Sequence, residues 1–197
     1  KPAIIKKYYK NQIDEHELIN QKTKCLILNM KRLTAVADAK NKGYDLAILD
    51  DGFQDYSIKK DLSILCFNGN QLIGNGMVLP SGPLRETLSQ INEARLVVIN
   101  GSKDEKFENK IKKISKNINI YYSRYLPTNI QQFKNKKLFA FAGIGNPNNF
   151  FKLLADNNLD VKKKFAFPDH YNYSKSEIEQ LILEGKKNDL SLITTEK

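Results

Sequence analysis

Apolar residues fall into short runs along the chain, and these runs alternate with stretches that suit helices. Strands are predicted at 3–5, 26–28, 46–49, 62–67 and 96–99. Helices are predicted at 13–21, 31–42, 85–94 and 104–117, the last with apolar residues at helical spacing among lysines. Strands and helices that alternate in this way are typical of a doubly wound α/β fold with a mostly parallel sheet.

The pattern changes after residue 117. Residues 118–130 contain β-prone aromatic residues and a proline without helical periodicity, which predicts extended linker strands. Four elements are predicted further on: strands at 138–141 and 164–167, a helix from Pro147 to about residue 157, and a helix that Ser174 begins with a capping box to Glu177. We therefore expect a core domain over 1–117, a β linker over 118–130 and a second, smaller α/β domain over 131–197.

The composition is that of a folded, globular chain. Its 197 residues are 41% hydrophobic, which is enough for a substantial core. No apolar run reaches the roughly 20 residues that span a bilayer, and the apolar start at 1–6 is too short for a signal peptide. Cys25 and Cys66 lie among apolar residues of predicted strands, so we expect buried, unpaired thiols in a reducing cytosol.

The chain is basic, with a net charge of +10. Lysines are concentrated at 110–116, 134–137 and 162–164, where they would attract anionic lipid head groups, a phosphorylated substrate or nucleic acid alike. Simple solvation of these lysines is the alternative, which the abundance of Lys, Asn and Ile favours. Because no RNA-binding aromatic motif accompanies the lysines, we expect no nucleic-acid partner.

Two adjacent carboxylates follow the apolar run at 46–49. Asp50 and Asp51 precede Gly52, and ligands of parallel α/β sheets bind beyond the carboxyl ends of the strands. Mg²⁺ typically binds one or two carboxylates together with substrate phosphates. The arrangement therefore predicts a magnesium site and phosphoryl transfer. From these residues alone, a polar turn in which Gly52 supplies backbone freedom is an equal alternative.

Five motifs extend this picture. They are Asp-Asp-Gly-Phe-Gln at 50–54, Gly-Asn-Gly-Met-Val-Leu-Pro-Ser-Gly-Pro-Leu-Arg-Glu at 74–86, Ala-Gly-Ile-Gly-Asn-Pro at 142–147, Asp-His at 169–170 and Thr-Glu-Lys at 195–197. In this order they resemble the tetraacyldisaccharide 4'-kinase family, the lipid A 4'-kinases, over nearly the whole chain.

The resemblance implies a P-loop-kinase-like fold and a phosphotransferase activity. Such an enzyme moves the γ-phosphate of ATP to the 4'-hydroxyl of a tetraacylated glucosamine disaccharide 1-phosphate, with Mg²⁺ as cofactor and ATP as co-substrate. Its partners would be this lipid A precursor and the cytoplasmic face of the bacterial inner membrane, where the enzyme would be peripheral.

The resemblance also implies roles for four acidic or imidazole side chains. Asp50 and Asp51 would hold the catalytic Mg²⁺. Asp14 matches the aspartate that the family pairs with a histidine, here His170, to activate the 4'-hydroxyl. A carboxylate that orients an imidazole is a suitable base for an alcohol that attacks phosphorus. Without the resemblance, Asp14 is an ordinary first-turn helix acid and His170 a structural histidine.

Four further residues are expected at the substrate. Arg85 and Glu86 match residues that line the active cleft of the family, and a planar guanidinium suits phosphate oxygens. Gln54 matches a glutamine that would position substrate or water. Arg32 matches a basic residue near the substrate, for which a solvated helix arginine is the alternative.

The chain departs from the family pattern in several places. Asp55 stands where the family has a histidine and would add a third carboxylate to the site. Ile13 replaces the glycine before Asp14, Lys6-Lys-Tyr-Tyr9 replaces Ser-Arg-Gly-Tyr, and the segment between Tyr9 and Asp14 is shorter. These departures concern substrate preference more than reaction type.

A Walker A loop is missing from the sequence. The nearest match, Gly143-Ile-Gly145, has no lysine to reach the β- and γ-phosphates, and the family has its loop upstream of the first strand. We therefore expect a fragment truncated at both ends and inactive alone. Two alternatives are a non-catalytic α/β binding module, such as a decayed kinase remnant, and a nucleic-acid-binding protein that uses the lysines.

Overall fold

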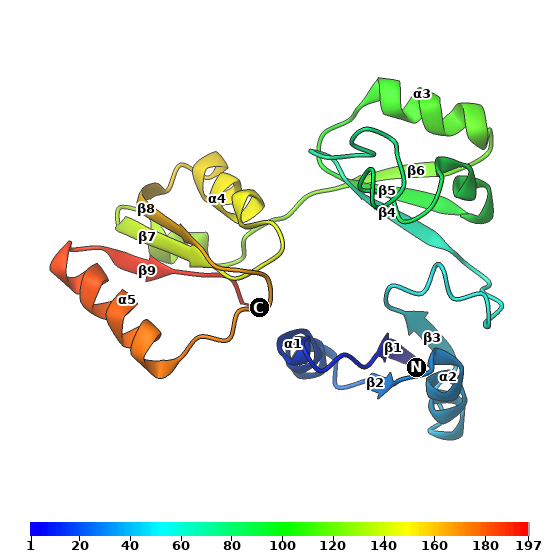
Figure 1. Ribbon diagram of the computed structural model, residues 1–197, viewed down its shortest axis with the longest axis horizontal. Helices are drawn as coiled ribbons and strands as arrows, with labels where there is room; N and C mark the ends of the chain where they lie inside the picture. Colours follow the sequence, from blue (N-terminus) through cyan, green and yellow to red (C-terminus); the bar gives the residue numbers. More distant parts are fainter. Residues whose placement is uncertain (197) are drawn as a thin grey trace. The chain divides into compact units, whose positions relative to one another are not determined.

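The computed structural model describes residues 1–196, in which the chain forms nine strands, five α-helices and two 3₁₀ helices (Figure 1). The chain divides into two compact units: unit 1 is Lys1–Asp50 with Pro127–Lys197, and unit 2 is Asp51–Leu126. Unit 1 contains two parallel sheets and unit 2 contains one. The domain boundaries at 118–130 stay a prediction.

The first sheet of unit 1 has the strand order β2-β1-β3. Its elements are β1 (Pro2–Lys7), α1 (Ile13–Thr23), β2 (Leu26–Asn29), α2 (Arg32–Asn41) and β3 (Leu46–Leu49). Its core consists of Ala3, Ile5, Ile27, Ala35 and Ala39, the last two on α2. The Asp50 N–H donates to the carbonyl of Ile5 at 2.9 Å, so the residue after β3 lies beside the end of β1. Parallel pairing thus brings Lys6 and Asp50 to one edge of the sheet.

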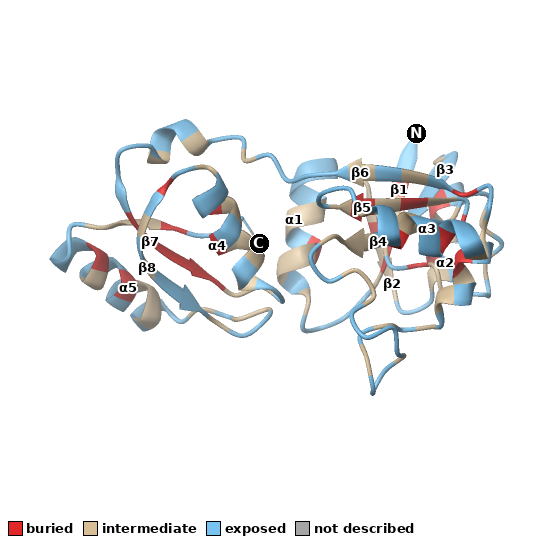
Figure 2. Cartoon of the chain, turned by 90° about the horizontal axis from the view of Figure 1, so that it is seen from above, coloured by how far each residue is buried: buried red, intermediate tan, exposed pale blue. Residues whose placement is uncertain are grey.

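The second sheet of unit 1 has the order β8-β7-β9. Its elements are η2 (Ile130–Phe133), β7 (Lys137–Ala142), α4 (Pro147–Asp156), β8 (Asp160–Ala166), α5 (Lys175–Lys187) and β9 (Ser191–Ile193). Leu138 and Ala140 of β7 pack in one core with α4, whereas Phe139 and Phe141 pack in another with Leu181 of α5. Because successive side chains alternate between faces, β7 is buried on both sides (Figure 2).

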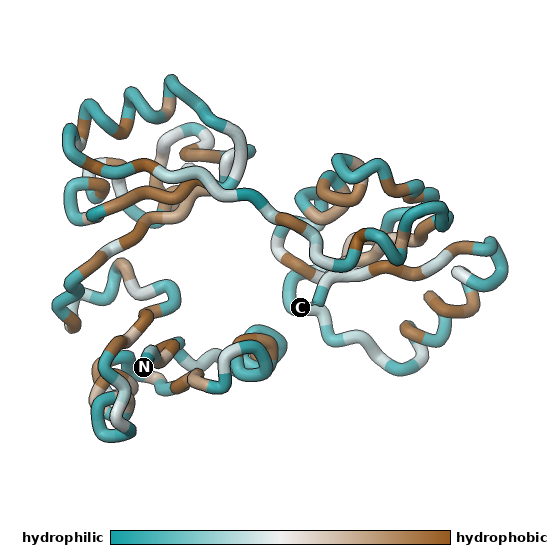
Figure 3. Tube along the Cα trace, turned by 180° about the vertical axis from the view of Figure 1, so that it is seen from behind, coloured by the Kyte–Doolittle hydropathy of each residue, from teal (hydrophilic) through white to brown (hydrophobic). Residues whose placement is uncertain are grey.

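The sheet of unit 2 has the order β4-β5-β6. Its elements are β4 (Ile64–Asn68), η1 (Leu88–Glu93), β5 (Leu96–Asn100), α3 (Glu105–Ile114) and β6 (Asn119–Ser123). Asp104 caps α3 by accepting a hydrogen bond from the Phe107 N–H at 2.8 Å. Phe107 and Ile111 are buried with Val97 and Ile99 of β5, so the few apolar positions of the mostly hydrophilic α3 pack inward (Figure 3).

Several predicted elements are present, and the differences have local causes. The parallel α/β class is confirmed, although the five strands predicted for the core lie in two sheets. The capping box at Ser174 is also present. The helix predicted at 85–94 is only the 3₁₀ helix η1, which begins after Thr87, a residue with extended dihedral angles. Of residues 118–130, which were predicted to be extended, Asn119–Ser123 form β6 and pair with β5 as an edge strand, whereas Ile130 begins η2.

The predicted burial of the cysteines is wrong for Cys66. Both thiols are free, as expected, but Cys66 is exposed and Cys25 is half-buried just before β2. Leu65 and Phe67 pack against the core of unit 2, and the two-residue period of a strand turns Cys66 to the opposite face.

Among residues 1–196, no helix combines the length and the apolar character that crossing a membrane requires.

Candidate active site

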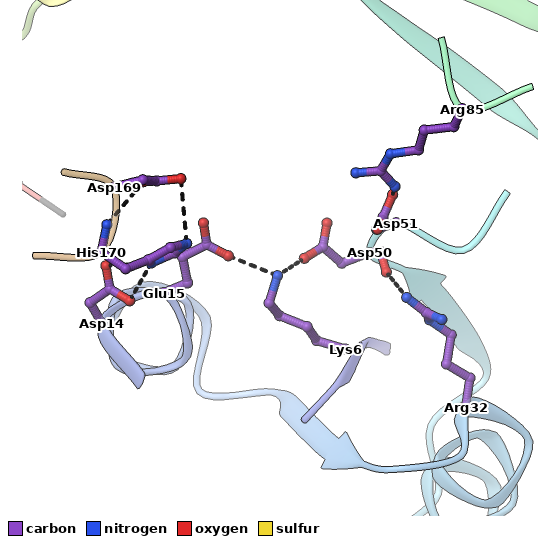
Figure 4. A network of polar contacts seen from close by, with 9 residues as sticks. All are labelled: Lys6, Asp14, Glu15, Arg32, Asp50, Asp51, Arg85, Asp169 and His170. Atoms are coloured by element: carbon purple, nitrogen blue, oxygen red, sulfur yellow. Dashed lines mark hydrogen bonds and ion pairs between the residues drawn. The ribbon is translucent and has the colours of Figure 1, made fainter. Parts of the chain in front are cut away.

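Asp14 and His170 meet within unit 1 although 156 residues separate them. The Nδ1 atom of His170 lies 2.9 Å and 3.0 Å from the two carboxylate oxygens of Asp14, which stands in the first turn of α1 (Figure 4). The side chains are 16% and 32% exposed, respectively. When Nδ1–H donates to this carboxylate, Nε2 keeps a lone pair that can accept a proton. The structure therefore brings together the two residues predicted as the acid–base pair.

Two glycines allow the segment that carries His170 to pack tightly. A Cβ on Gly143 would lie 3.0 Å from the Cβ of Tyr171, and a Cβ on Gly145 would lie 3.0 Å from Oδ2 of Asp169. His170 itself has a φ of 54°, in the left-handed region that few non-glycine residues adopt. Its N–H donates to Asp169 Oδ1 at 3.0 Å. The glycines thus act on the histidine segment through close packing.

Lys6 is a buried cation between two acids at the edge of the first sheet. Its Nζ lies 2.5 Å from Asp50 Oδ2 and 2.9 Å from Glu15 Oε2, and its side chain is only 10% exposed. Burial acts to lower the pKa of Lys6, but the hydrogen bonds to Asp50 and Glu15 outweigh it, and the pKa is raised above its ordinary value. Lys6 is therefore an ammonium at neutral pH.

Arg32 also contacts Asp50, on the backbone side. Its Nη2 donates to the Asp50 carbonyl at 3.0 Å from the start of α2. The guanidinium predicted near the substrate thus lies next to the predicted metal ligand, and it supports the backbone there.

In unit 2, Arg85 and Asp51 form an exposed ion pair. Arg85 Nη1 lies 2.5 Å from Asp51 Oδ1, and the side chains are 60% and 55% exposed. Asp51 has a φ of 54°, again in the left-handed region. The turn that follows is fixed by Lys60, whose Nζ donates to the carbonyls of Phe53 at 3.1 Å and Asp55 at 2.7 Å. Sequence reasoning missed Lys60.

Glu86 and Asp55 of unit 2 form side-chain hydrogen bonds within that unit. Glu86 accepts a hydrogen bond from the Tyr56 hydroxyl at 3.2 Å, and Gln54 is half-buried. The Asp55 carboxylate accepts from the N–H of Ser57 at 3.2 Å and also from its hydroxyl, so it serves the local turn. Among residues 1–196 there is no cluster of three or more His, Cys, Asp or Glu side chains that could hold a metal ion.

The donor set nevertheless fits Mg²⁺. Asp50 and Asp51 are consecutive residues with side chains 41% and 55% exposed, so each carboxylate is accessible from solvent. Mg²⁺ is commonly held by one or two carboxylates, with water and substrate phosphates completing its coordination. Each carboxylate is paired with a cationic side chain, Lys6 for Asp50 and Arg85 for Asp51.

The fold matches a solved structure of an ATP-binding protein. A crystal structure described as the "apo" form of LpxK from Aquifex aeolicus in complex with ATP superposes with a TM-score of 0.66, covering 100% of this chain and 68% of that one at 21% identity. This likeness defines the class: an α/β protein with the fold of a P-loop kinase.

The family follows from the sequence. The family model for tetraacyldisaccharide-1-P 4'-kinase matches residues 9–197. The chain belongs to the tetraacyldisaccharide-1-P 4'-kinase family.

Two curated relatives carry the name tetraacyldisaccharide 4'-kinase. The protein from Pelagibacter ubique is 43% identical over 99% of this chain, and that from Bradyrhizobium diazoefficiens is 35% identical over 87%. The chain spans 63% and 52% of their lengths, respectively.

The motif at 195–197 lies at the end of the described residues. Glu196 forms an ion pair with Lys22 of α1, and Lys197 lies outside the described residues.

Proposed function

We propose that the protein is a tetraacyldisaccharide 4'-kinase, which moves the γ-phosphate of ATP to the 4'-hydroxyl of a tetraacylated glucosamine disaccharide 1-phosphate. The observation that carries this proposal is the contact between Asp14 and His170 at 2.9 Å in a chain of this family. The names of the relatives and the ATP in the Aquifex aeolicus structure support it.

In this proposal, His170 is the general base. Asp14 accepts the hydrogen bond from Nδ1–H, holds the ring in place and stabilises the imidazolium that forms. Nε2 takes the proton of the 4'-hydroxyl while the 4'-oxygen forms a bond to the γ-phosphorus. The bond between that phosphorus and the oxygen that bridges it to the β-phosphate breaks, and ADP leaves.

Asp50 and Asp51 are the proposed ligands of Mg²⁺, which would offset the negative charge of the phosphates when bound. Arg85 is exposed and carries a guanidinium that can donate two parallel hydrogen bonds to a phosphate. Glu86 and Gln54 are proposed to contact the sugar. Arg32 is proposed to act near the substrate by supporting the backbone of Asp50, given its 3.0 Å bond to that carbonyl.

A lipid substrate implies that the enzyme works at the cytoplasmic face of the inner membrane. The apolar residues Phe107 and Ile111 of α3 are buried, so contact of this helix with head groups would be electrostatic, through Lys110, Lys112 and Lys113. Reversal of these three charges should weaken binding to anionic vesicles. If vesicle binding is unchanged, α3 has no part in it.

The direct test is an assay of the full-length gene product with γ-labelled ATP, Mg²⁺ and the tetraacyldisaccharide 1-phosphate. We expect label at the 4'-position and its loss in the His170→Ala variant. Absence of both transfer and Mg²⁺ binding would favour a non-catalytic remnant. Salt-dependent RNA binding that survives the joint replacement of Asp50 and Asp51 by Asn would favour the nucleic-acid alternative.

A further inference from the structure

The positively charged side chain of Lys6 forms an ion pair with Asp50, a carboxylate that is proposed to bind Mg²⁺. The ammonium nitrogen lies 2.5 Å from Asp50 Oδ2 and 2.9 Å from Glu15 Oε2, its second partner (Figure 4). All three residues belong to unit 1. The lysine lies on β1, Asp50 directly follows β3, and Glu15 is in the first turn of α1.

We propose that Lys6 is a resident cation that competes with Mg²⁺ for Asp50, so that the metal binds firmly only together with the phosphates of ATP. The inference rests on the proposed role of Asp50 as a metal ligand. It adds a residue that sets the metal affinity of the site.

The exposed fractions of the two partners make this exchange possible. Asp50 is 41% exposed and accessible to an ion from solvent, whereas Lys6 is 10% exposed and confined by its surroundings. When Asp50 turns to a metal, Lys6 keeps Glu15 as its partner and remains charged within the site. The ammonium then repels the metal. Even with the screening of bulk water, a unit charge about 6 Å from a divalent ion weakens its binding about tenfold.

A purely structural ion pair makes the opposite prediction. If Lys6 only positioned Asp50, its removal would leave the carboxylate less ordered, and metal affinity would stay the same or fall. Competition requires that affinity rise when the positive charge is removed. The sign of the change therefore separates the two accounts.

The test is a titration of the full-length gene product with Mn²⁺ alone, followed by electron paramagnetic resonance of the free ion. We expect Lys6→Met to bind Mn²⁺ at least about tenfold more tightly than the wild type, and Lys6→Arg to stay within about threefold. The matched control is Lys7→Met, which removes the same charge one position along β1, where the lysine lies over the ring of Tyr9. An affinity of Lys6→Met equal to or below that of the wild type overturns the proposal.

A second variant tests whether Asp50 is the group for which the two cations compete. The higher Mn²⁺ affinity of Lys6→Met should disappear in the double variant Lys6→Met/Asp50→Asn. If the higher affinity persists there, the proposal is overturned. Should Lys6→Met fail to fold, the ammonium signals of the wild type in ¹⁵N NMR serve instead. Saturating Mg²⁺ should shift the signal of Lys6 and leave that of Lys7 in place, and an unshifted Lys6 signal contradicts competition.

The kinase proposal and the Lys6 proposal fail separately. Phosphoryl transfer without a gain in metal affinity for Lys6→Met removes only the role of Lys6. A gain in affinity without phosphoryl transfer supports competition at Asp50 and removes the proposed kinase activity.

Discussion

Units 1 and 2 hold their candidate site residues in different ways. In unit 1, Lys6 and His170 are 10% and 16% exposed and contact acids on other elements of the fold. In unit 2, Arg85 and Asp51 pair while 60% and 55% exposed. Exposed ion pairs contribute only about 0–1 kcal/mol, whereas a partly buried group that loses its partner costs about 1–3 kcal/mol.

The difference separates a preorganised pair from an exchangeable one. The Asp14–His170 contact is fixed by packing around the histidine segment, so the proposed acid–base pair is already in place. The Arg85–Asp51 contact costs little to break, so each side chain can exchange its partner for a phosphate or a metal ion. The largest effects are therefore expected in unit 1.

Replacement of His170 by Ala should have the largest effect. Loss of a positioned base is expected to lower the rate of phosphoryl transfer by roughly a hundredfold to ten-thousandfold. The measurement is kcat with labelled ATP in the full-length gene product. The other histidine, His16, provides the control, since His16→Phe should keep most of the activity. A His170→Ala enzyme with a wild-type kcat would show that the Asp14–His170 pair of unit 1 has no catalytic role.

Replacement of Arg85 by Ala should have a smaller effect. It removes the proposed charged donor to phosphate, which would cost roughly a tenfold to hundredfold loss in kcat/KM. Thermal stability should stay unchanged because the pair with Asp51 is exposed. Arg85→Lys should recover only part of the activity because the parallel donors are lost. If Arg85→Ala also lowers Tm, and the lost stability accounts for the lost activity, the pair is structural.

Replacement of Gly143 by Ala should disturb unit 1 indirectly. The new Cβ would meet the Cβ of Tyr171 at 3.0 Å, and overpacking of this kind costs roughly 1–3 kcal/mol. We expect a lower unfolding free energy in urea together with a several-fold loss of kcat. Gly145→Ala is the matched variant and should be milder, because its new Cβ would meet the end of the Asp169 side chain rather than a Cβ. Equal kcat values for Gly143→Ala and the wild type would exclude control of His170 by this packing.

The smallest effect concerns pH. Burial lowers the pKa of His16, with the charge of Lys6 acting in the same direction, and the ring is only 6% exposed and stacks on Tyr8. The unfolded chain then binds more protons, so this contribution to stability is complete above the ordinary pKa of about 6.5 and is lost as the pH falls below it. Urea unfolding at pH 7.5 and 5.5 should reveal a loss that His16→Phe reduces and His170→Ala retains. An equal loss in both variants would contradict this account.

The local pattern was enough for the parallel α/β class but not for every element. Strand β7 was predictable because its apolar residues are continuous, as expected for a strand buried on both faces. Strand β9 was missed because its three residues, Ser191–Ile193, carry almost no pattern of their own and depend on pairing with β7. Exposure of Cys66 depended on which face of β4 packs, which composition does not reveal.

The candidate site was predictable only in part. Asp50 and Asp51 could be singled out from their place after a strand, but the pairing of Asp14 with His170 came from the family resemblance, since no local period links residues 156 apart. Lys6 was noted only as a departure from the family pattern. Its contacts with Glu15 and Asp50 depend on the parallel pairing of β1 with β3 and on the position of α1.

The central claim is that Asp14 and His170 act as one catalytic unit, and a double-mutant cycle tests it most directly. The rate of phosphoryl transfer would be measured for Asp14→Asn, His170→Ala and the double variant. We predict that the double variant is about as slow as His170→Ala alone, because Asp14 acts through the imidazole. Losses that multiply, so that the double variant is slower by the product of the two single effects, would contradict the account.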